Sequence, residues 1–116
     1  MTENRNTVLQ YIDGFRKTDR EQILSLVTND VVWKIPGAFE IKGRSAFAAH
    51  IVDEGFRTNP DIIVERLVEG TDVVVAEGTV STERTDGTVL HLAFCDLFEI
   101  RDSKIAQLTS YLVQIP

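Results

Sequence analysis

The sequence predicts an α+β domain in which three helices cover a strongly curved antiparallel sheet and leave a pocket between the two layers. Two observations carry this prediction. Apolar residues recur at helical spacing early in the chain and alternate with polar residues from residue 61 onward. Turn signals divide the alternating part into long consecutive strands. Strands joined by tight turns form an antiparallel meander, and helices that precede such a meander are expected to cover one of its faces.

The first half of the chain predicts the three helices and one strand. Apolar residues at helical spacing between positions 8 and 15 predict an amphipathic helix over residues 2–17. Thr18 and Glu21 then match a capping box, with the Thr18 hydroxyl at the N-cap of a short second helix. A β-rich run at 31–35 predicts a strand that Pro36-Gly37 ends. After Gly43, apolar residues on one helical face predict a third helix over residues 44–55.

The second half predicts four strands, over residues 62–69, 72–85, 88–100 and 104–114. Strands longer than about ten residues do not stay flat, so we expect strong curvature, with a bulge or bend at Gly78. A curved sheet covered by helices leaves a cavity on its concave side, where small molecules commonly bind.

The turn between the second and third of these strands sets a pairing register. Asp86-Gly87 matches a two-residue hairpin loop, in which both central residues take positive φ. Such a loop pairs residue 85 with residue 88, and it places Asp96 opposite Glu77 on the same face of the sheet. Two carboxyl groups this close in an apolar pocket do not ionise together easily, so one pKa rises and the pair could act as acid and base.

Composition excludes several classes of protein. The formal net charge of −6 and the pI of about 4.8 disfavour binding to nucleic acid. No apolar stretch approaches the ~20 residues of a membrane-spanning helix, so no membrane partner is expected. The first residues carry no apolar signal core, and Cys95 is the one cysteine. We therefore expect a cytoplasmic chain in which residues 1–116 form a single domain.

The order of elements and four short stretches resemble the nuclear transport factor 2 superfamily, and within it the ketosteroid isomerases and SnoaL-like polyketide cyclases. The resemblance spans nearly the whole chain and implies a cone-shaped, cystatin-like fold with an internal pocket. The stretches that carry it are Val8-Leu9-Gln10-Tyr11, Thr18-Asp19 leading into Ile23-Leu24-Ser25-Leu26, Gly43-Arg44-Ser45-Ala46-Phe47, and Cys95-Asp96-Leu97-Phe98-Glu99-Ile100 before Lys104-Ile105.

The resemblance also implies two catalytic positions. Tyr11 stands where ketosteroid isomerases place an oxyanion-hole tyrosine, and Asp96 stands where they place a protonated aspartic acid. Their general-base aspartate is replaced by Ile35, which cannot move a proton. Glu77 is the substitute base that the hairpin register suggests, although a solvated strand residue is the commoner role for a glutamate there. Tyr11 could equally be an amphipathic residue at the helix–sheet boundary, and Asp96 a structural hydrogen-bond acceptor.

The two faces of the sheet are expected to differ in use. The outer face is expected to mediate a homodimer through Ala76, Gly78, Val80, His91, Ala93, Cys95 and Leu97. The pocket is expected to be lined by Phe15, Trp33, Ile35, Phe47, Thr79, Ser81, Leu92, Phe94, Phe98, Leu108 and Leu112. No Gly-rich phosphate loop, nucleophile elbow or paired-cysteine motif occurs, so we expect neither a cofactor nor a metal.

Three functions remain open from the sequence. The first is an isomerase, cyclase or lyase that moves a proton next to a carbonyl of a small, partly apolar substrate. The second is a module that binds a small hydrophobic ligand without chemistry, which the missing base at Ile35 favours. The third is a dimeric partner-binding domain with a collapsed pocket.

Overall fold

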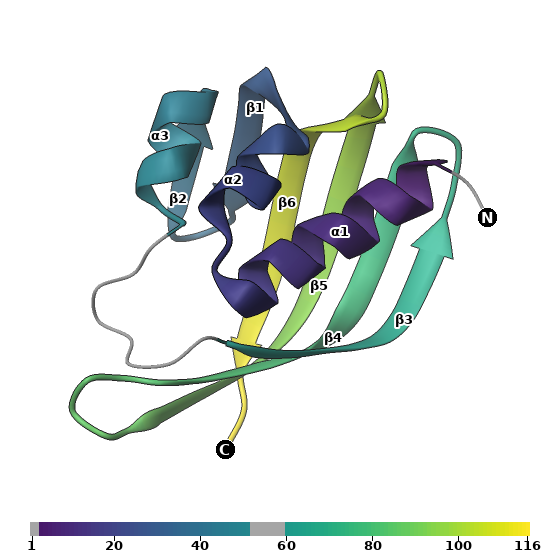
Figure 1. Cartoon of the computed structure of the whole chain (residues 1–116). Coiled ribbons are helices and arrows are strands. Elements are labelled where there is room, and N and C mark those ends of the chain that lie inside the picture. The colour runs from purple at the N-terminus through teal and green to yellow at the C-terminus, as the bar shows by residue number, and fades with distance from the viewer. Residues whose placement is uncertain (1–2, 52–59) are drawn as a thin grey trace.

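The computed structural model describes residues 3–51 and 60–116, and these residues form three helices and six strands (Figure 1). The helices are α1 (Glu3–Lys17), α2 (Arg20–Ser25) and α3 (Arg44–Ala49). The strands are β1 (Val27–Ile35), β2 (Phe39–Lys42), β3 (Asp61–Glu69), β4 (Val73–Glu83), β5 (Val89–Arg101) and β6 (Lys104–Gln114). The predicted α+β class is confirmed.

The sequence predicts a wholly antiparallel sheet, but the sheet in the structure is mixed. Its strand order is β2-β1-β6-β5-β4-β3. Strands β3 to β6 form the expected antiparallel meander, but β1 pairs in parallel with β6, for example Trp33 with Leu108. Parallel neighbours need a long connection, and here everything between β1 and β6 supplies it. Strong curvature and a conical outline stay predictions.

The first hairpin adds strand structure that the sequence patterns missed. β1 begins at Val27 instead of residue 31, and after the Pro36-Gly37 turn the chain forms a further strand, β2. The Glu40 carboxylate lies 3.8 Å from the Lys34 ammonium and 3.4 Å from that of Lys42. Cross-strand opposite charges of this kind support a short, exposed hairpin, and they give Glu40 a structural contact away from any cavity.

The start of α2 is capped by Asp19 instead of Thr18. The Asp19 carboxylate accepts a hydrogen bond from the Gln22 backbone N–H at 3.1 Å, whereas Thr18 takes a φ of 51° in the turn after α1. An aspartate satisfies the free N–H groups of a helix start as well as a threonine does. The third helix ends at Ala49, and residues 52–55 of its predicted range lie outside the described residues.

The β4–β5 loop has three residues instead of two. Arg84 N–H donates to the Thr88 carbonyl at 2.8 Å, Gly87 N–H donates to the Arg84 carbonyl at 2.9 Å, and Gly87 takes a φ of 89°. A turn followed by a left-handed glycine is the usual three-residue hairpin. The extra residue shifts the whole register by one, so Asp96 faces Ala76 and Glu77 faces Cys95.

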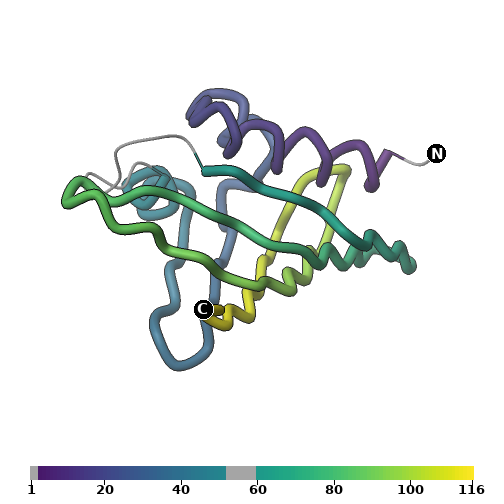
Figure 2. The backbone as a smooth tube through the Cα atoms, turned by 90° about the horizontal axis from the view of Figure 1, so that it is seen from below, coloured from purple at the N-terminus to yellow at the C-terminus, as the bar shows by residue number. Residues whose placement is uncertain are grey.

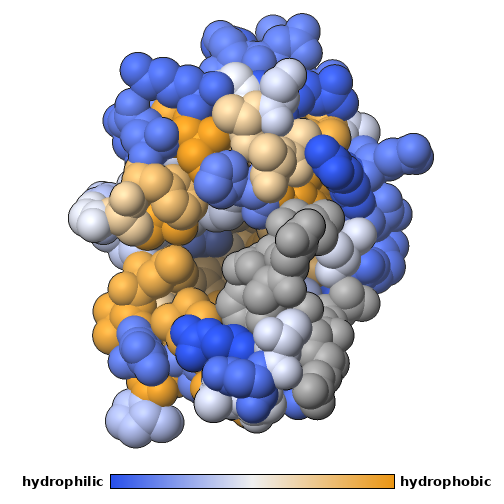
Figure 3. Space-filling model, turned by 90° about the vertical axis from the view of Figure 1, so that its left-hand side faces the viewer, coloured by the Kyte–Doolittle hydropathy of each residue, from blue (hydrophilic) through white to orange (hydrophobic). Residues whose placement is uncertain are grey.

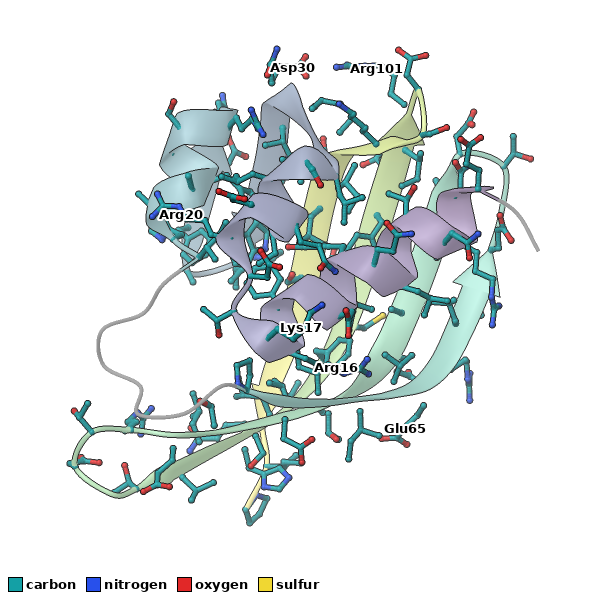
Figure 4. The ribbon with its side chains drawn as sticks, in the orientation of Figure 1. Arg16, Lys17, Arg20, Asp30, Glu65 and Arg101 are labelled. Carbon is teal, nitrogen blue, oxygen red and sulfur yellow. The ribbon has the colours of Figure 1, made fainter. Side chains whose placement is uncertain are left out.

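Helix α1 lies across the meander and contacts β3, β4 and β6, so it covers one side of the sheet (Figures 1 and 2). Val8, Tyr11 and Ile12 lie on the buried side of α1, as the helical spacing predicts. The Arg16 side chain, at the end of the helix, donates to the Ile62 carbonyl of β3 at 3.0 Å (Figure 4). This contact joins the C-terminal end of α1 to the start of the meander.

The bulge expected at Gly78 lies in the neighbouring strand. The β3–β4 register shifts between Val64 and Arg66, so Glu65 is the additional residue, and Val64 pairs with Gly78. A Cβ on Gly78 would fall onto the Ile63 carbonyl oxygen. The glycine therefore allows the close approach of the two backbones that the bulge produces.

Candidate functional site

Tyr11 lies on the face of α1 that packs against the sheet, where it is 3% exposed. Its ring makes edge-to-face contacts with Phe15, at a centroid distance of 5.0 Å, and with Phe98 of β5, at 5.4 Å. These contacts fix the direction of the ring. Burial raises the pKa of the Tyr11 hydroxyl well above its ordinary value, and the charge of Asp96 raises it further. Tyr11 is therefore a neutral hydroxyl that can donate a hydrogen bond.

Asp96 lies in the middle of β5, directly opposite the buried Ser110 of β6. Hydrogen bonding with the nearby Ser110 hydroxyl favours the ionised form of the Asp96 carboxyl and so lowers its pKa. The indole Nε1 of Trp33 in β1 donates to the Ser110 Oγ at 3.1 Å. The other carboxyl oxygen of Asp96, Oδ1, is buried and has no hydrogen-bond partner among the described residues. Asp96, Ser110 and Trp33 thus lie together on three neighbouring strands, and Oδ1 of the carboxyl lacks a partner among the described residues.

The pKa of Asp96 is raised from 3.8 to about 7, chiefly because burial penalises the charged form. The hydrogen bond from Ser110 opposes this rise. Near neutral pH, a large share of the molecules therefore carries a neutral carboxylic acid at this position. A neutral acid can donate a hydrogen bond, which an ionised carboxylate cannot.

Tyr11 and Asp96 line the same cavity, of about 240 Å³, between α1 and the sheet. The other lining residues are nearly all apolar, and the side of the molecule in Figure 3 shows a hollow bordered by apolar side chains. The complete lining is Tyr11, Ile12, Phe15, Trp33, Pro60, Ile62, Val80, Phe94, Asp96, Phe98, Leu108, Ser110 and Leu112.

The structure brings together about half of the residues that the sequence pointed to as lining. Those at the cavity, besides Tyr11 and Asp96, are Phe15, Trp33, Phe94, Phe98, Leu108 and Leu112. Those outside its lining are Ile35, Phe47, Thr79, Ser81 and Leu92. Phe47 is buried in the core behind the lining, with its ring 5.3 Å from that of Trp33. Thr79 and Ser81 lie on the opposite face because of the one-residue shift in register.

The same shift removes Glu77 from the cavity. Glu77 pairs with Cys95 on the outer face, and its exposed carboxylate lies 3.6 Å from Arg66 Nε. The predicted pair of carboxyl groups does not form, because residues adjacent along a strand point to opposite faces. The expected outer-face positions at Ala76, Gly78 and Val80 are wrong for the same reason.

The sequence patterns missed Ser110, which lies directly opposite Asp96 on the neighbouring strand. A simple register counted from the turn pair Arg101–Lys104 would place Thr109 opposite Asp96. The register of β5 and β6 shifts between Glu99 and Ile100, and this shift brings Ser110 opposite Asp96 instead. No sequence signal marks that bulge. Val80 lies at the cavity instead of on the predicted outer face because the hairpin loop has one more residue than predicted, and Ile62 pairs with Val80 across β3 and β4.

Outside the cavity, the described residues include no candidate metal site. No group of three or more His, Cys, Asp or Glu side chains within residues 3–51 and 60–116 is placed to hold a metal ion. None of the described helices is long and apolar enough to cross a membrane. Cys95 is a free thiol on the outer face, and its pKa is raised by burial.

Solved structures with the same fold place the chain in a broad structural class. An LEH-like epoxide hydrolase from M. tuberculosis is 18% identical, with a TM-score of 0.86 over 96% of this chain and 83% of that one. An NTF2-like protein of unknown function from Burkholderia pseudomallei is 17% identical, with a TM-score of 0.88 over 97% of this chain and 92% of that one. TerC, co-crystallised with polyporic acid, is 24% identical, with a TM-score of 0.83 over 94% of this chain and 90% of that one. The fold is thus nuclear transport factor 2-like.

The sequence narrows that class to one family. Residues 8–108 match the SnoaL-like domain, so the chain belongs to the SnoaL-like domain family. None of the curated proteins matches the sequence significantly.

Proposed function

We propose that the cavity binds a small, mostly apolar molecule through one oxygen atom, which accepts hydrogen bonds from Asp96 and Tyr11. The observation that carries the proposal is the Asp96 carboxyl in the lining of an otherwise apolar cavity, with a buried Oδ1 that has no hydrogen-bond partner among the described residues. A buried polar atom without a partner costs about 1–3 kcal/mol. A ligand oxygen at this point removes that cost, and the apolar lining takes up the remainder of the ligand.

The size of the cavity limits the ligand. Its volume of about 240 Å³ lies below the usual range for drug-sized ligands, ~300–1,000 Å³. At ~30 Å³ for each liquid water, it equals about eight water volumes. A ligand on the order of ten non-hydrogen atoms fits this space. TerC is a member of the same fold class that was crystallised with a small organic molecule, which supports a small-molecule function for the cavity.

An enzyme of the isomerase, cyclase or lyase type is the second candidate, and the pair of donors favours it. In proton abstraction next to a carbonyl, Asp96 and Tyr11 would donate to the enolate oxygen. Asp96 is the one carboxyl group among the described residues that line the cavity. Glu77, the predicted substitute base, is not in the lining, and neither is Ile35, which replaces the base of the ketosteroid isomerases. A separate base is therefore missing from the described lining, and this absence places binding ahead of catalysis.

Trp33 is the one tryptophan of the chain, and it lies in the cavity wall, so its fluorescence reports binding directly. We expect cyclohexyl methyl ketone to change the Trp33 emission in a saturable way. Asp96→Leu removes the donor and should weaken binding about tenfold, as the loss of one hydrogen bond predicts. Asp96→Asn keeps a donor group and serves as the matched control. An absent response of the wild type, or equal affinity in Asp96→Leu, would contradict the proposal.

We also propose a homodimer through the outer face of the sheet. Ile63, Thr79, Ala93 and Val113 form one cross-strand row, and Ile63 and Val113 are 53% and 63% exposed. Exposed apolar side chains in a continuous patch commonly mark an interface. Val113→Lys should shift the mass measured by light scattering from dimer to monomer. The same change at Val89, outside the row, is the control, and a wild-type monomer would exclude this interface.

The remaining expectations concern the chain as a whole. We propose that residues 1–116 form a single domain, which the family match over residues 8–108 supports. A cytoplasmic location is also proposed, since the lone Cys95 thiol has no disulfide partner. Cell fractionation with an antibody against the native protein tests that location.

A further inference from the structure

An exposed cation, Arg16, lies at the C-terminal end of α1 on the side that faces β3 (Figure 4). Its neighbour in the chain, Phe15, lines the cavity and is half-buried. Its Nε donates to the backbone carbonyl of Ile62 at 3.0 Å, and Ile62 is a second half-buried residue of the lining. The guanidinium of Arg16 is therefore fixed at the rim of the cavity, where the apolar lining between α1 and β3 meets solvent.

The contact with Ile62 leaves most of the hydrogen-bonding capacity of Arg16 unused. A guanidinium carries five N–H groups in a rigid plane, and the Nε–H bond to the Ile62 carbonyl uses one of them. The other four belong to the two Nη atoms, which together form a fork that matches the two oxygens of a carboxylate. Within residues 3–51 and 60–116, none of the ion pairs includes Arg16.

The charged groups beside Arg16 do not compensate its charge. Lys17, the next cation along the helix, is paired with the Asp13 carboxylate at 2.9 Å, so these two charges neutralise each other. Asp61, at the start of β3, is paired in register with Ser81 on the outer face of the sheet. Residues opposite each other on neighbouring strands share a face, so the Asp61 side chain points away from the cavity. In the part of the chain that the structure describes, Arg16 thus remains an uncompensated positive charge at the rim.

We propose that Arg16 is a specificity-determining residue, which binds the carboxylate of a ligand whose apolar body fills the cavity. The ligand class is then a small apolar carboxylic acid, ionised near neutral pH. The proposal rests on the proposed function, because it needs the cavity to bind the apolar body. A carboxylate at the rim keeps part of its water, so the large cost of burying a charge is avoided. Arg16 supplies a single positive charge, which suits a carboxylate better than a phosphate monoester, whose charge is near −2 at neutral pH.

A matched pair of probes isolates the ionic contact: 5-cyclohexyl-5-oxopentanoate and its primary amide. Both carry the cyclohexyl ketone that tests the proposed function, and they differ in the charge of the terminal group. The homologous pairs with one methylene fewer and one methylene more vary the reach of that group, and the pair with the highest ratio is used. Titration calorimetry gives the ratio of acid affinity to amide affinity. A change in the shape of the cavity alters both affinities together, whereas loss of the ionic contact lowers the ratio.

We expect a wild-type ratio of about fivefold at pH 6 and low salt, the upper range for an exposed ion pair. The ratio should fall toward one in Arg16→Gln, with the amide affinity unchanged. Arg16→Lys restores the charge and should keep the ratio above that of Arg16→Gln. Lys17→Gln, the matched control, removes the same charge from the neighbouring position and should leave the ratio unchanged. The wild-type ratio should also decrease when NaCl is raised from about 0.05 M to about 0.5 M, because salt screens exposed charges.

Failure of this proposal differs from failure of the proposed function. A wild type that does not bind the amide, or an amide affinity that is equal in Asp96→Leu, contradicts the proposed function itself. A wild type that binds the amide through Asp96 but binds the acid no better overturns the role of Arg16 alone. An equal fall of the ratio in Arg16→Gln and Lys17→Gln overturns it as well, since it reports a long-range effect of charge. Circular dichroism confirms folding, and if Arg16→Gln does not fold, a wild-type ratio that is independent of salt overturns the proposal.

Discussion

Replacing Asp96 with asparagine removes the titration of the buried carboxyl while keeping its shape. The pKa of Asp96 is about 7 in the folded chain and is expected to be near 3.8 when the chain unfolds. Between these values, the folded state holds a proton that the unfolded state has released. The free energy of unfolding of the wild type must therefore fall as the pH rises through this interval, by about 1.4 kcal/mol for each pH unit.

The magnitude follows from the width of the interval. The whole contribution is about 4 kcal/mol, present in full below about pH 4 and lost by about pH 7. Between pH 5 and 7, where folding is easily measured, the difference in unfolding free energy between wild type and Asp96→Asn should fall by about 2–3 kcal/mol. Above about pH 8 the difference should be constant, because the carboxyl is then ionised in both states.

Urea denaturation of both proteins at pH 5, 6, 7 and 8 measures this difference. All other titratable groups are the same in both proteins, so their contributions to the difference cancel. A difference that stays constant from pH 5 to 8 would refute the reasoning, since it would mean that the Asp96 carboxyl ionises like an exposed one. Asp96 would then be ionised near neutral pH, and it could not donate the hydrogen bond that the proposed function needs.

Three further predictions concern single side chains. The stability of Ser110→Ala should level off at a higher pH than that of the wild type, because Ser110 lowers the pKa of Asp96. The same series of urea denaturations measures this shift in pH. Gly78→Ala should destabilise the fold by at least about 1–3 kcal/mol, because the new methyl meets the Ile63 carbonyl. In Gly70→Ala, the nearest atom to the new methyl is 3.6 Å away, so this variant should lose far less stability. Thermal melting of both variants measures the difference. Asp19→Ala should cost about 1 kcal/mol through loss of the α2 cap, and equal melting temperatures would exclude that role.

Local patterns were sufficient for most of the secondary structure. The helical spacing that predicts residues 2–17 gives α1 almost to the residue, and the four alternating segments agree with β3 to β6 within two residues at each end. Burial of one face imposes these periods, so they can be read from the chain itself. β2 is only four residues long and carries Glu40 and Lys42, and so short a polar strand has no clear period.

The candidate site shows how much depends on counting correctly across a turn. The Asp86-Gly87 pattern predicts a two-residue loop, whereas the loop in the structure has one more residue. A single residue of register reverses every side chain of the paired strand. Glu77 therefore faces solvent beside Arg66, although it was expected beside Asp96. Asp96 itself faces the cavity, as its place between phenylalanines at alternate positions suggested.

The layers of this protein, the order of its elements and the presence of a carboxyl and a phenol that need a buried partner can be inferred from local patterns in the chain. Those features follow from periodicity and residue type, which act over a few neighbouring positions. The parallel pairing of β1 with β6, the position of Ser110 and Trp33 beside Asp96, and the place of Asp96 in the cavity lining depend on contacts between distant strands. Bulges and loop lengths set these contacts, and such small irregularities are resolved by packing among strands that are distant in the chain.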